Sequence, residues 1–95
     1  MTIPFETLRR RWMKDAKFRA EYERIGPDME LAFTLAEARR KARLTQAELA
    51  ARMGTSQAAV ARIESGRGAP KWSTIERYAR AVGARPVVRL REAAE

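Results

Sequence analysis

Residues 45–65, TQAELAARMGTSQAAVARIES, constrain the fold of this chain more than any other stretch. Thr45 and Glu48 have the spacing of a capping box, in which each side chain satisfies a free backbone N–H at the start of a helix. Gly54 stands where this helix must end, because glycine readily adopts the positive φ of a helix terminus. Ser56 can then cap a second helix. The stretch therefore predicts two short helices joined by a tight turn.

The turn between these helices is the informative part of the pattern. Ala50 lets the second helix cross close over the first, and Gly54 keeps the turn short. This arrangement resembles the helix-turn-helix of the phage-repressor or Xre family, in which the second helix lies in the major groove of DNA. An αα-hairpin without a ligand is the alternative, since leucine and alanine at helical spacing also form ordinary cores. The positions that carry the resemblance are Gln46, Ala47, Leu49, Ala50, Gly54, Ser56, Gln57, Val60, Ile63, Glu64 and Gly66.

The charge balance agrees with a nucleic-acid ligand. The 95 residues include 20 lysines and arginines against 12 acids, a formal net charge of +8, and the pI is about 11.0. A pI above about 9 is typical of nucleic-acid-binding domains. A solvated basic surface, or one that meets an acidic protein, would give the same composition. Charge alone therefore leaves these three interpretations open.

The sequence contains no cysteine and no histidine. Disulfides, thiol chemistry and histidine-based acid–base catalysis are therefore excluded, and the ligands of common zinc sites are missing. There is no glycine-rich phosphate loop, so we expect no metal, no cofactor and no enzymatic activity. No apolar run approaches the roughly 20 residues of a membrane span, and the first residues lack the apolar region of a signal peptide. We accordingly expect a cytoplasmic protein without membrane contact.

Three segments are predicted along the chain. Residues 1–26 form a helical extension that is interrupted beside Asp15, which can cap its second part. The Gly26–Pro27 pair is expected to break this helix. Residues 27–84 form the helix-turn-helix domain, and residues 85–95 form a terminal strand and tail.

The first helix of the domain, from Asp28 to about Arg43, has two apolar faces. A helix that is apolar on two sides usually packs against neighbours on both. The face that includes Leu35 is expected to close the core of the helix-turn-helix. The face that includes Met29 and Phe33 is expected to receive the N-terminal helices, or else to remain open for another protein.

The end of the domain begins with a basic loop after Gly66. Ser73 and Glu76 form a second capping box for the last helix, which starts on one side or the other of Trp72. The indole of Trp72 is expected in the core. Gly83 is expected to end the helix.

The segment after this helix departs from the helical pattern. Its apolar residues alternate with arginines, which predicts a short β-strand. Because a strand needs a pairing partner, we expect it to join two copies as a homodimer or to pair with a different protein. A disordered basic tail is the alternative. The residues expected at this contact are Val87, Val88 and Leu90. The predicted fold class is all-α, a lambda-repressor-like helix-turn-helix domain with an N-terminal helical extension and a short C-terminal β-strand.

Side-chain type and the family resemblance together assign the DNA-binding roles. Glutamine can pair with adenine and arginine with guanine, while an alanine methyl contacts the thymine methyl. By the resemblance, Gln57, Ala58 and Arg62 on the second helix read bases, although other members carry a second polar side chain where this chain has Ala58. The residues expected to contact phosphates are Arg43, Gln46, Ser56, Arg67 and Lys71. For each loop cation, a solvated side chain is the alternative.

The resemblance also implies an ion pair between Arg39 and Glu64. In the family, the matching arginine and glutamate tie the helix before the motif to the end of the recognition helix. The pair would therefore orient the reading helix without touching DNA.

The whole chain, and not only the motif, resembles antitoxins of the HigA type. The resemblance covers the pattern W…DAKFRAEYE in residues 12–23, the module in residues 30–66 and the VVRL-type tail. It implies an antitoxin that neutralises a HigB/RelE-like mRNA interferase toxin by direct binding. It also implies repression of the antitoxin's own operon through a palindromic double-stranded operator, bound as a dimer. The alternatives are a stand-alone Xre-family repressor of phage or chromosomal origin, and a protein-interaction domain with a degenerate helix-turn-helix.

In an antitoxin of this type, the N-terminal segment would face the toxin. Aromatic anchors are favoured at protein interfaces, although the same side chains could instead complete a core over Phe33. The residues expected to bind the toxin are Phe5, Leu8, Trp12, Phe18 and Tyr22.

Overall fold

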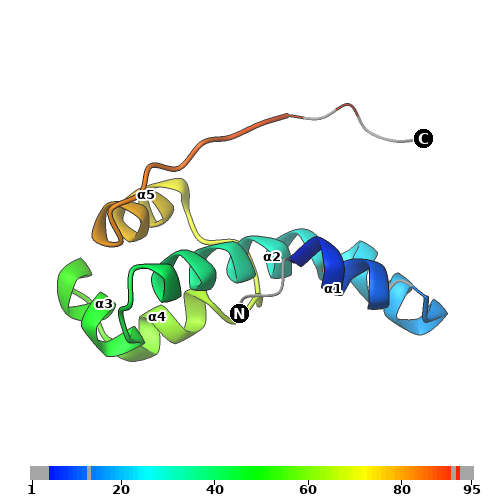
Figure 1. The fold of residues 1–95 in the computed structure, drawn as a ribbon, viewed down its shortest axis with the longest axis horizontal. Coiled ribbons are helices and arrows are strands. Elements are labelled where there is room, and N and C mark those ends of the chain that lie inside the picture. Colours follow the sequence, from blue (N-terminus) through cyan, green and yellow to red (C-terminus); the bar gives the residue numbers. More distant parts are fainter. Residues whose placement is uncertain (1–4, 13, 91, 93–95) are drawn as a thin grey trace.

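The computed structural model describes residues 5–12, 14–90 and 92, which contain five helices and no strand (Figure 1). The helices are α1 (Phe5–Trp12), α2 (Ala16–Lys41), α3 (Gln46–Met53), α4 (Gln57–Ile63) and α5 (Trp72–Ala81). The helices α3, α4 and α5 gather around the C-terminal half of α2, and α1 folds back along its N-terminal half (Figure 1). The predicted all-α class with a helix-turn-helix domain is confirmed.

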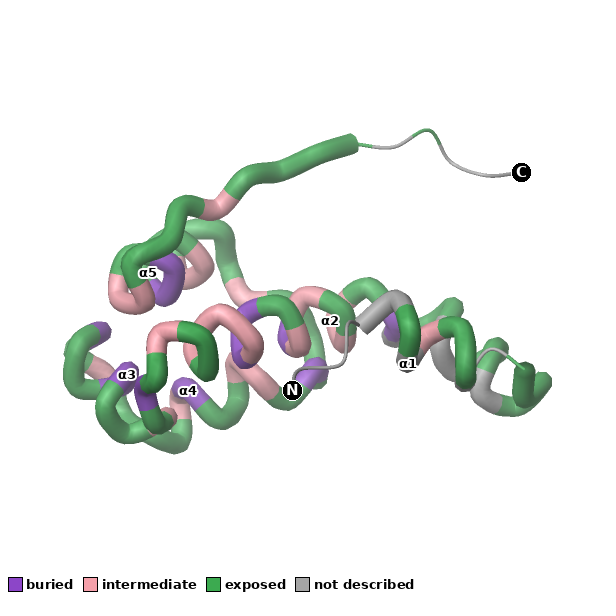
Figure 2. The backbone as a smooth tube through the Cα atoms, in the orientation of Figure 1, coloured by how far each residue is buried: buried purple, intermediate pink, exposed green. Residues whose placement is uncertain are grey.

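The core lies where the last four helices meet. Leu49 of α3, Val60 of α4 and Tyr78 of α5 are fully buried, and Leu35 of α2 packs in the same cluster. Figure 2 shows these buried positions concentrated in this part of the chain. The prediction that the Leu35 face of α2 closes the core is therefore correct.

Local backbone chemistry builds the turn as the sequence predicts. The Glu48 amide donates to Thr45 Oγ1 at 3.0 Å, and the Thr45 amide donates to Glu48 Oε1 at 2.9 Å, which completes the capping box. Gly54 takes a left-handed conformation with φ 69°. Ser56 Oγ accepts a hydrogen bond from the Ala59 amide at 3.1 Å and starts α4.

Arginine side chains also lock α3 to α5. Arg52 of α3 donates to the carbonyl of Ala81, the last residue of α5, at 3.1 Å. Arg77 of α5 donates to the carbonyl of Met53, the last residue of α3, at 2.7 Å. Each cation therefore satisfies a free carbonyl at the negative end of the other helix. These two hydrogen bonds hold α3, the helix that precedes the turn, against α5.

The helix α2 runs through Pro27 without interruption, so the predicted break at Gly26–Pro27 is wrong. Proline removes one helical hydrogen bond and strains the turn before it, but packing on this segment outweighs that cost. Gly26 is buried. Met29 lies against Gly66 of the loop after α4, where an added Cβ would stand 3.2 Å from the Met29 Cα. The Met29 end of the second face of α2 thus contacts this loop, where we expected the N-terminal helices.

The predicted interruption beside Asp15 is correct, because Asp15 Oδ1 accepts from the Lys17 amide at 2.8 Å.

The start of α5 and the segment after it differ from prediction. α5 begins at Trp72 after Lys71, whose side chain makes no cap hydrogen bond, so Ser73 and Glu76 do not form the expected capping box. Trp72 is 46% exposed and does not lie in the core.

The expected strand, with Val87, Val88 and Leu90, is absent from the described residues. Residues 85–90 have no regular structure and make no backbone hydrogen bond within the described part of the chain, because a β-ladder needs a second strand and this part of the chain offers none.

The end of α2 carries an unusual left-handed residue, Arg43, with φ 60°. The amides of Arg43 and Leu44 donate back to carbonyls of the last turn of α2, at 2.9 and 3.2 Å, which is the Schellman pattern. The corresponding turns after α3 and α5 place Gly54 and Gly83 at this position. Of these three turns, the one at Arg43 alone bears the steric cost of a Cβ in this conformation.

Replacing Arg43 with glycine should therefore stabilise the fold by about 0.5–1 kcal/mol, after allowance for the greater entropy of glycine in the unfolded chain. Urea unfolding followed by circular dichroism would measure the change. Arg43→Ala is the matched control, because it removes the charge and keeps the strain. Equal stability of the two variants would show that the strain at φ 60° is no larger than the entropic cost of glycine.

Candidate nucleic-acid interface

The helix α4 separates a buried side from an exposed one. Val60 is fully buried against the core, whereas Gln57, Ala58 and Arg62 are all exposed. The three residues expected to read bases thus share the outer side of a helix whose inner side is anchored. A hydrogen-bonding amide, a methyl group and a guanidinium are the groups that recognise base edges in the major groove.

The residues expected to contact phosphates lie at the starts of α3 and α4 and in the loops after α2 and α4. Ser56 caps α4, and its hydroxyl keeps a proton to donate while its oxygen accepts from Ala59. Arg43, Arg67 and Lys71 are exposed in the loops after α2 and α4. The Arg67 amide donates to Ser65 Oγ at 3.2 Å, which holds the start of the second loop. These exposed residues can therefore offer positive charge or a hydrogen-bond donor to phosphates.

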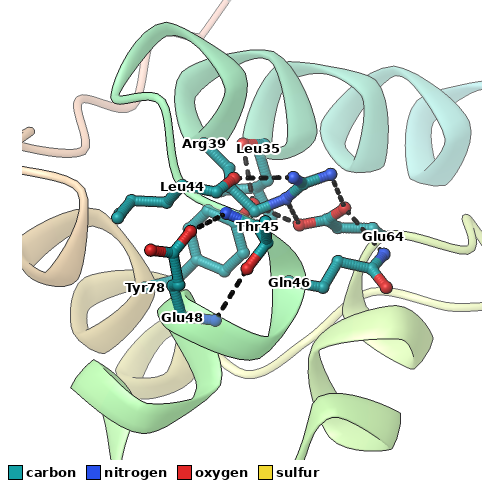
Figure 3. Close-up of polar contacts among 8 residues, drawn as sticks. All are labelled: Leu35, Arg39, Leu44, Thr45, Gln46, Glu48, Glu64 and Tyr78. Atoms are coloured by element: carbon teal, nitrogen blue, oxygen red, sulfur yellow. Dashed lines mark hydrogen bonds and ion pairs between the residues drawn. The ribbon is translucent and has the colours of Figure 1, made fainter.

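The structure brings Arg39 and Glu64 together beneath this surface (Figure 3). Arg39 Nε donates to Glu64 Oε2 at 2.8 Å, and Arg39 Nη2 donates to Glu64 Oε1 at 3.0 Å. The exposed fractions of the two side chains are only 13% and 5%. A third donor of Arg39, Nη1, reaches the Leu44 carbonyl at 2.9 Å. One guanidinium therefore joins the end of α2 to the end of α4.

Two further side chains complete what we call the Glu64 cluster, formed by Arg39, Gln46, Glu64 and Tyr78 (Figure 3). Gln46 Nε2 donates to Glu64 Oε1 at 3.2 Å. The Tyr78 hydroxyl lies 2.6 Å from Glu64 Oε2 and 2.8 Å from the Leu35 carbonyl, and its single proton serves these two acceptors. The Glu64 carboxylate thus links α2, α3, α4 and α5.

Sequence reasoning missed part of this cluster. It assigned no hydrogen-bonding role to Tyr78 and treated Gln46 as a phosphate ligand only. A signal for Tyr78 was present, because a buried tyrosine hydroxyl usually has a hydrogen-bond partner. Nothing in the spacing of Gln46 pointed to Glu64, which lies 18 residues further along the chain. Since an amide nitrogen carries two protons, Gln46 retains one for a phosphate.

The electrostatics of the cluster favour the ionised carboxylate. Burial raises the pKa of Glu64, but hydrogen bonds from Arg39, Tyr78 and Gln46 outweigh burial and hold this pKa below its usual value. The hydrogen bond to Glu64 raises the pKa of Arg39. Burial and the neighbouring carboxylate raise the pKa of Tyr78. Each group therefore keeps the protonation state that its partners require near neutral pH.

This arrangement predicts acid sensitivity. Because the pKa of Glu64 is lower in the folded chain than its ordinary value of 4.5, ionisation of Glu64 stabilises the fold at pH values above 4.5. The contribution is lost as the pH falls through the lowered pKa. We expect the stability difference between the native chain and Glu64→Gln to narrow between pH 7 and about pH 3. Urea unfolding of both proteins at both pH values would measure this stability difference. A difference that does not change with pH would contradict the conclusion that Glu64 is ionised in the folded chain.

The side chains of the expected toxin-binding residues lie outside the described part of the structure. Phe5, Leu8 and Trp12 belong to α1, and Phe18 and Tyr22 belong to α2, but only their backbone is described.

No described helix is long and apolar enough to cross a membrane. Among the described side chains, no group of three acids could hold a metal ion.

Comparison with known proteins agrees with this geometry. A family model described as a helix-turn-helix domain matches residues 30–93. The chain is also 38% identical over 71 residues to Antitoxin HigA1 of two strains of Mycobacterium tuberculosis, CDC 1551 / Oshkosh and ATCC 25618 / H37Rv. The match covers 75% of this chain and 48% of either relative, so the chain spans about half the length of these proteins. No solved structure matches the chain. The matched family model covers α3, the turn and α4, and the chain belongs to the helix-turn-helix domain family.

Proposed function

We propose that this chain is a DNA-binding antitoxin. In this role it binds a palindromic operator as a dimer, represses its own operon and neutralises a RelE-like mRNA interferase toxin by direct contact. The observation that carries the proposal is the exposed row of Gln57, Ala58 and Arg62 on a helix whose far end is held by the Glu64 cluster. The similarity to Antitoxin HigA1 supports the choice of an antitoxin over other regulators.

The DNA-binding part of the proposal rests on two sets of residues on and near α4, which contact different parts of the DNA. Gln57 and Arg62 read base edges, while Ser56, Arg67 and the second amide proton of Gln46 contact phosphates. One such module buries a small DNA surface, so tight and specific binding needs two modules. In a two-fold dimer the reading helices would lie about 34 Å apart, one turn of B-DNA. The operator is accordingly an inverted repeat.

The toxin-binding part rests on the N-terminal extension. The helix α1 and the first turns of α2 lie at the end of the molecule away from α3 and α4 (Figure 1). A partner on the extension would therefore leave the outer side of α4 free. The aromatic residues of the extension, from Phe5 to Tyr22, are side chains of the type that anchor protein interfaces.

Two binding measurements test the proposal. Fluorescence anisotropy on the chain's own promoter should show saturable binding that weakens steeply with salt, because phosphate contacts release counterions. A RelE-like toxin encoded beside this chain should copurify with it and stop cleaving mRNA in a translation extract. Binding to the promoter without any toxin partner would favour a stand-alone repressor. Failure to bind the promoter would favour the interpretation that the chain is a protein-interaction domain with a degenerate helix-turn-helix.

A truncated chain separates the two activities. Removing residues 1–14 deletes α1 but keeps Asp15, whose carboxylate caps α2. We expect toxin affinity to fall at least about 30-fold, as when an interface loses a group of anchors. DNA affinity should stay the same, because no residue of the Glu64 cluster is removed. Unchanged toxin affinity would place the toxin site elsewhere.

A further inference from the structure

A groove between α3 and α5 is lined mainly by arginines. Its volume is about 450 Å³, and its walls are Arg52 and Met53 of α3 and Arg77, Arg80 and Ala81 of α5. The two helices pack against each other at the end of the molecule away from the N-terminal extension (Figure 1). We call this site the arginine groove. Among the described residues that line it, none belongs to α4, so the arginine groove is separate from the base-reading row.

Backbone carbonyls hold two of the three cations in place. Arg52 Nη1 donates to the Ala81 carbonyl at 3.1 Å, and Arg77 Nη2 donates to the Met53 carbonyl at 2.7 Å. A guanidinium carries five N–H donors, so each of these side chains keeps most of its donors for a ligand. Arg80 is exposed and makes no hydrogen bond or ion pair with another described residue. The groove therefore offers three guanidinium groups, two of which are already oriented.

The acids nearest along the chain, Glu48 and Glu76, do not pair with these cations. The Thr45 amide donates to Glu48 Oε1 at 2.9 Å and holds that carboxylate in the capping box. Glu76 stands one turn before Arg80 on α5, yet the two side chains form no ion pair. The ends of α3 and α5 each contribute roughly −0.5 elementary charge through the helix dipole. Set against three full positive charges, these helix ends leave a net charge of about +2 at the groove.

The cations of the groove also repel one another. Residues three or four apart on a helix are neighbours, and like charges on neighbouring residues destabilise the helix. Arg77 and Arg80 are neighbours of this kind, and Arg52 adds a third cation from α3. Arg80 gives the fold no hydrogen bond in return, and a local cost without such a gain is expected mainly at functional sites. A bound anion would relieve the repulsion and join α3 to α5.

We propose that the arginine groove binds a compact anion with several phosphate groups in a row, as in inorganic triphosphate or the triphosphate of a nucleotide. Guanidinium groups pair with phosphate oxygens through two parallel hydrogen bonds, and the groove presents three such groups. The volume of the groove falls within the roughly 300–1,000 Å³ of small-molecule sites. The proposal goes beyond the proposed function, because it requires neither DNA binding nor toxin binding.

A small anion fits this groove better than a protein or the operator does. Protein interfaces need aromatic or aliphatic anchors, and none of the large apolar side chains that are exposed in the described chain lines the groove. The operator is expected at Gln46, the first residue of α3, whereas Arg52 lies near the end of that helix, about 9 Å further along its axis. A duplex seated on α4 would therefore meet the other end of α3.

Thermal unfolding of the full chain tests the proposal. A ligand that binds only the folded chain raises Tm in a saturable way. Inorganic triphosphate in magnesium-free buffer should raise Tm by at least about 4 °C relative to sodium chloride at equal ionic strength. Orthophosphate, which has one phosphate group, should give a much smaller rise. The same titration with adenosine triphosphate distinguishes the two sources of the ligand: tighter binding would assign the site to nucleotides, and equal or weaker binding to the inorganic anion.

Substitution at Arg80 tests the location of the site. Arg80→Gln should weaken triphosphate binding at least about tenfold, because it removes charge-assisted hydrogen bonds. The fold should be retained, since the Arg80 side chain makes no hydrogen bond within the described chain. The matched control is Arg10→Gln, which removes an exposed arginine from α1 and should leave the affinity unchanged. In amide NMR spectra, triphosphate should shift the signals of Met53 and Ala81 and leave that of Gln57 in place.

Stabilisation no greater than that by sodium chloride, or equal loss of affinity in Arg80→Gln and Arg10→Gln, would overturn the proposal. Tighter binding of a hexaglutamate peptide than of triphosphate would overturn it by assigning the groove to an acidic protein. If Arg80→Gln lost promoter affinity and kept triphosphate affinity, the groove would be a DNA contact instead. Failure of the proposed function has a different signature, because a native chain that binds neither promoter nor toxin would still bind triphosphate.

Discussion

Replacing Glu64 with alanine is expected to lower the free energy of unfolding by about 3–5 kcal/mol. The substitution leaves the Arg39 guanidinium, which is 13% exposed, without its carboxylate partner. It also removes the acceptor for Gln46 and one acceptor for Tyr78. A buried charge or donor without a partner costs more than the net value of the bond itself. The effect is therefore larger than for most single substitutions.

Thermal unfolding would measure this loss. For a domain of this size each kcal/mol corresponds to roughly 4–8 °C in Tm, so the transition should move down by more than about 10 °C. The matched control is Arg39→Met combined with Glu64→Leu, which removes both charges and keeps the volume apolar. We expect this double variant to be more stable than Glu64→Ala. An unchanged Tm for Glu64→Ala would refute the view that the cluster supports the fold.

The same variants separate support of the reading helix from direct contact with DNA. Glu64 lies beneath the surface, and Gln57 and Arg62 lie outside it. Promoter binding by Glu64→Ala should thus weaken in proportion to unfolding, and recover at a temperature where the variant is fully folded. A loss of binding that persists in the folded variant would mean that the cluster also tunes the geometry of α4.

Local signals in the sequence were sufficient to predict the turn and its caps. Thr45, Glu48, Gly54 and Ser56 act through hydrogen bonds or backbone angles within a few residues of their own positions. Such interactions depend little on the rest of the fold. The outward direction of Gln57 and Arg62 follows from the same helix, because burial of Val60 fixes which side faces solvent.

Features that depend on distant contacts were not predictable in this way. Pro27 is a strong local signal for a break, yet packing of Gly26 and Met29 keeps α2 continuous. The Tyr78 hydroxyl meets Leu35, which is 43 residues away in the chain. The extended segment around Val88 has a strand-like pattern, but pairing requires a second strand. In each case the deciding interaction lies far away in the sequence or outside the described chain.

Combined replacement of Gln57 and Arg62 by alanine should abolish preference for the operator while leaving the fold intact. A bidentate contact to a base discriminates by about 1–3 kcal/mol, so losing both should reduce the preference by roughly 2–6 kcal/mol. Both side chains are exposed, and alanine is a good helix former. The thermal transition should therefore change little. Anisotropy on the promoter and on a scrambled duplex of equal length, at one fixed salt concentration, measures the preference.

Arg67→Ala and Lys71→Ala are the matched controls, because they remove positive charge from the loop beside α4 and leave the base-reading row unchanged. Each should weaken binding to both duplexes by a similar factor and reduce the slope of log affinity against log salt by about 1. The contrast separates base reading from attraction to the phosphate backbone. If the Gln57 and Arg62 double variant kept its preference for the promoter, the reading surface would have to lie on a helix other than α4.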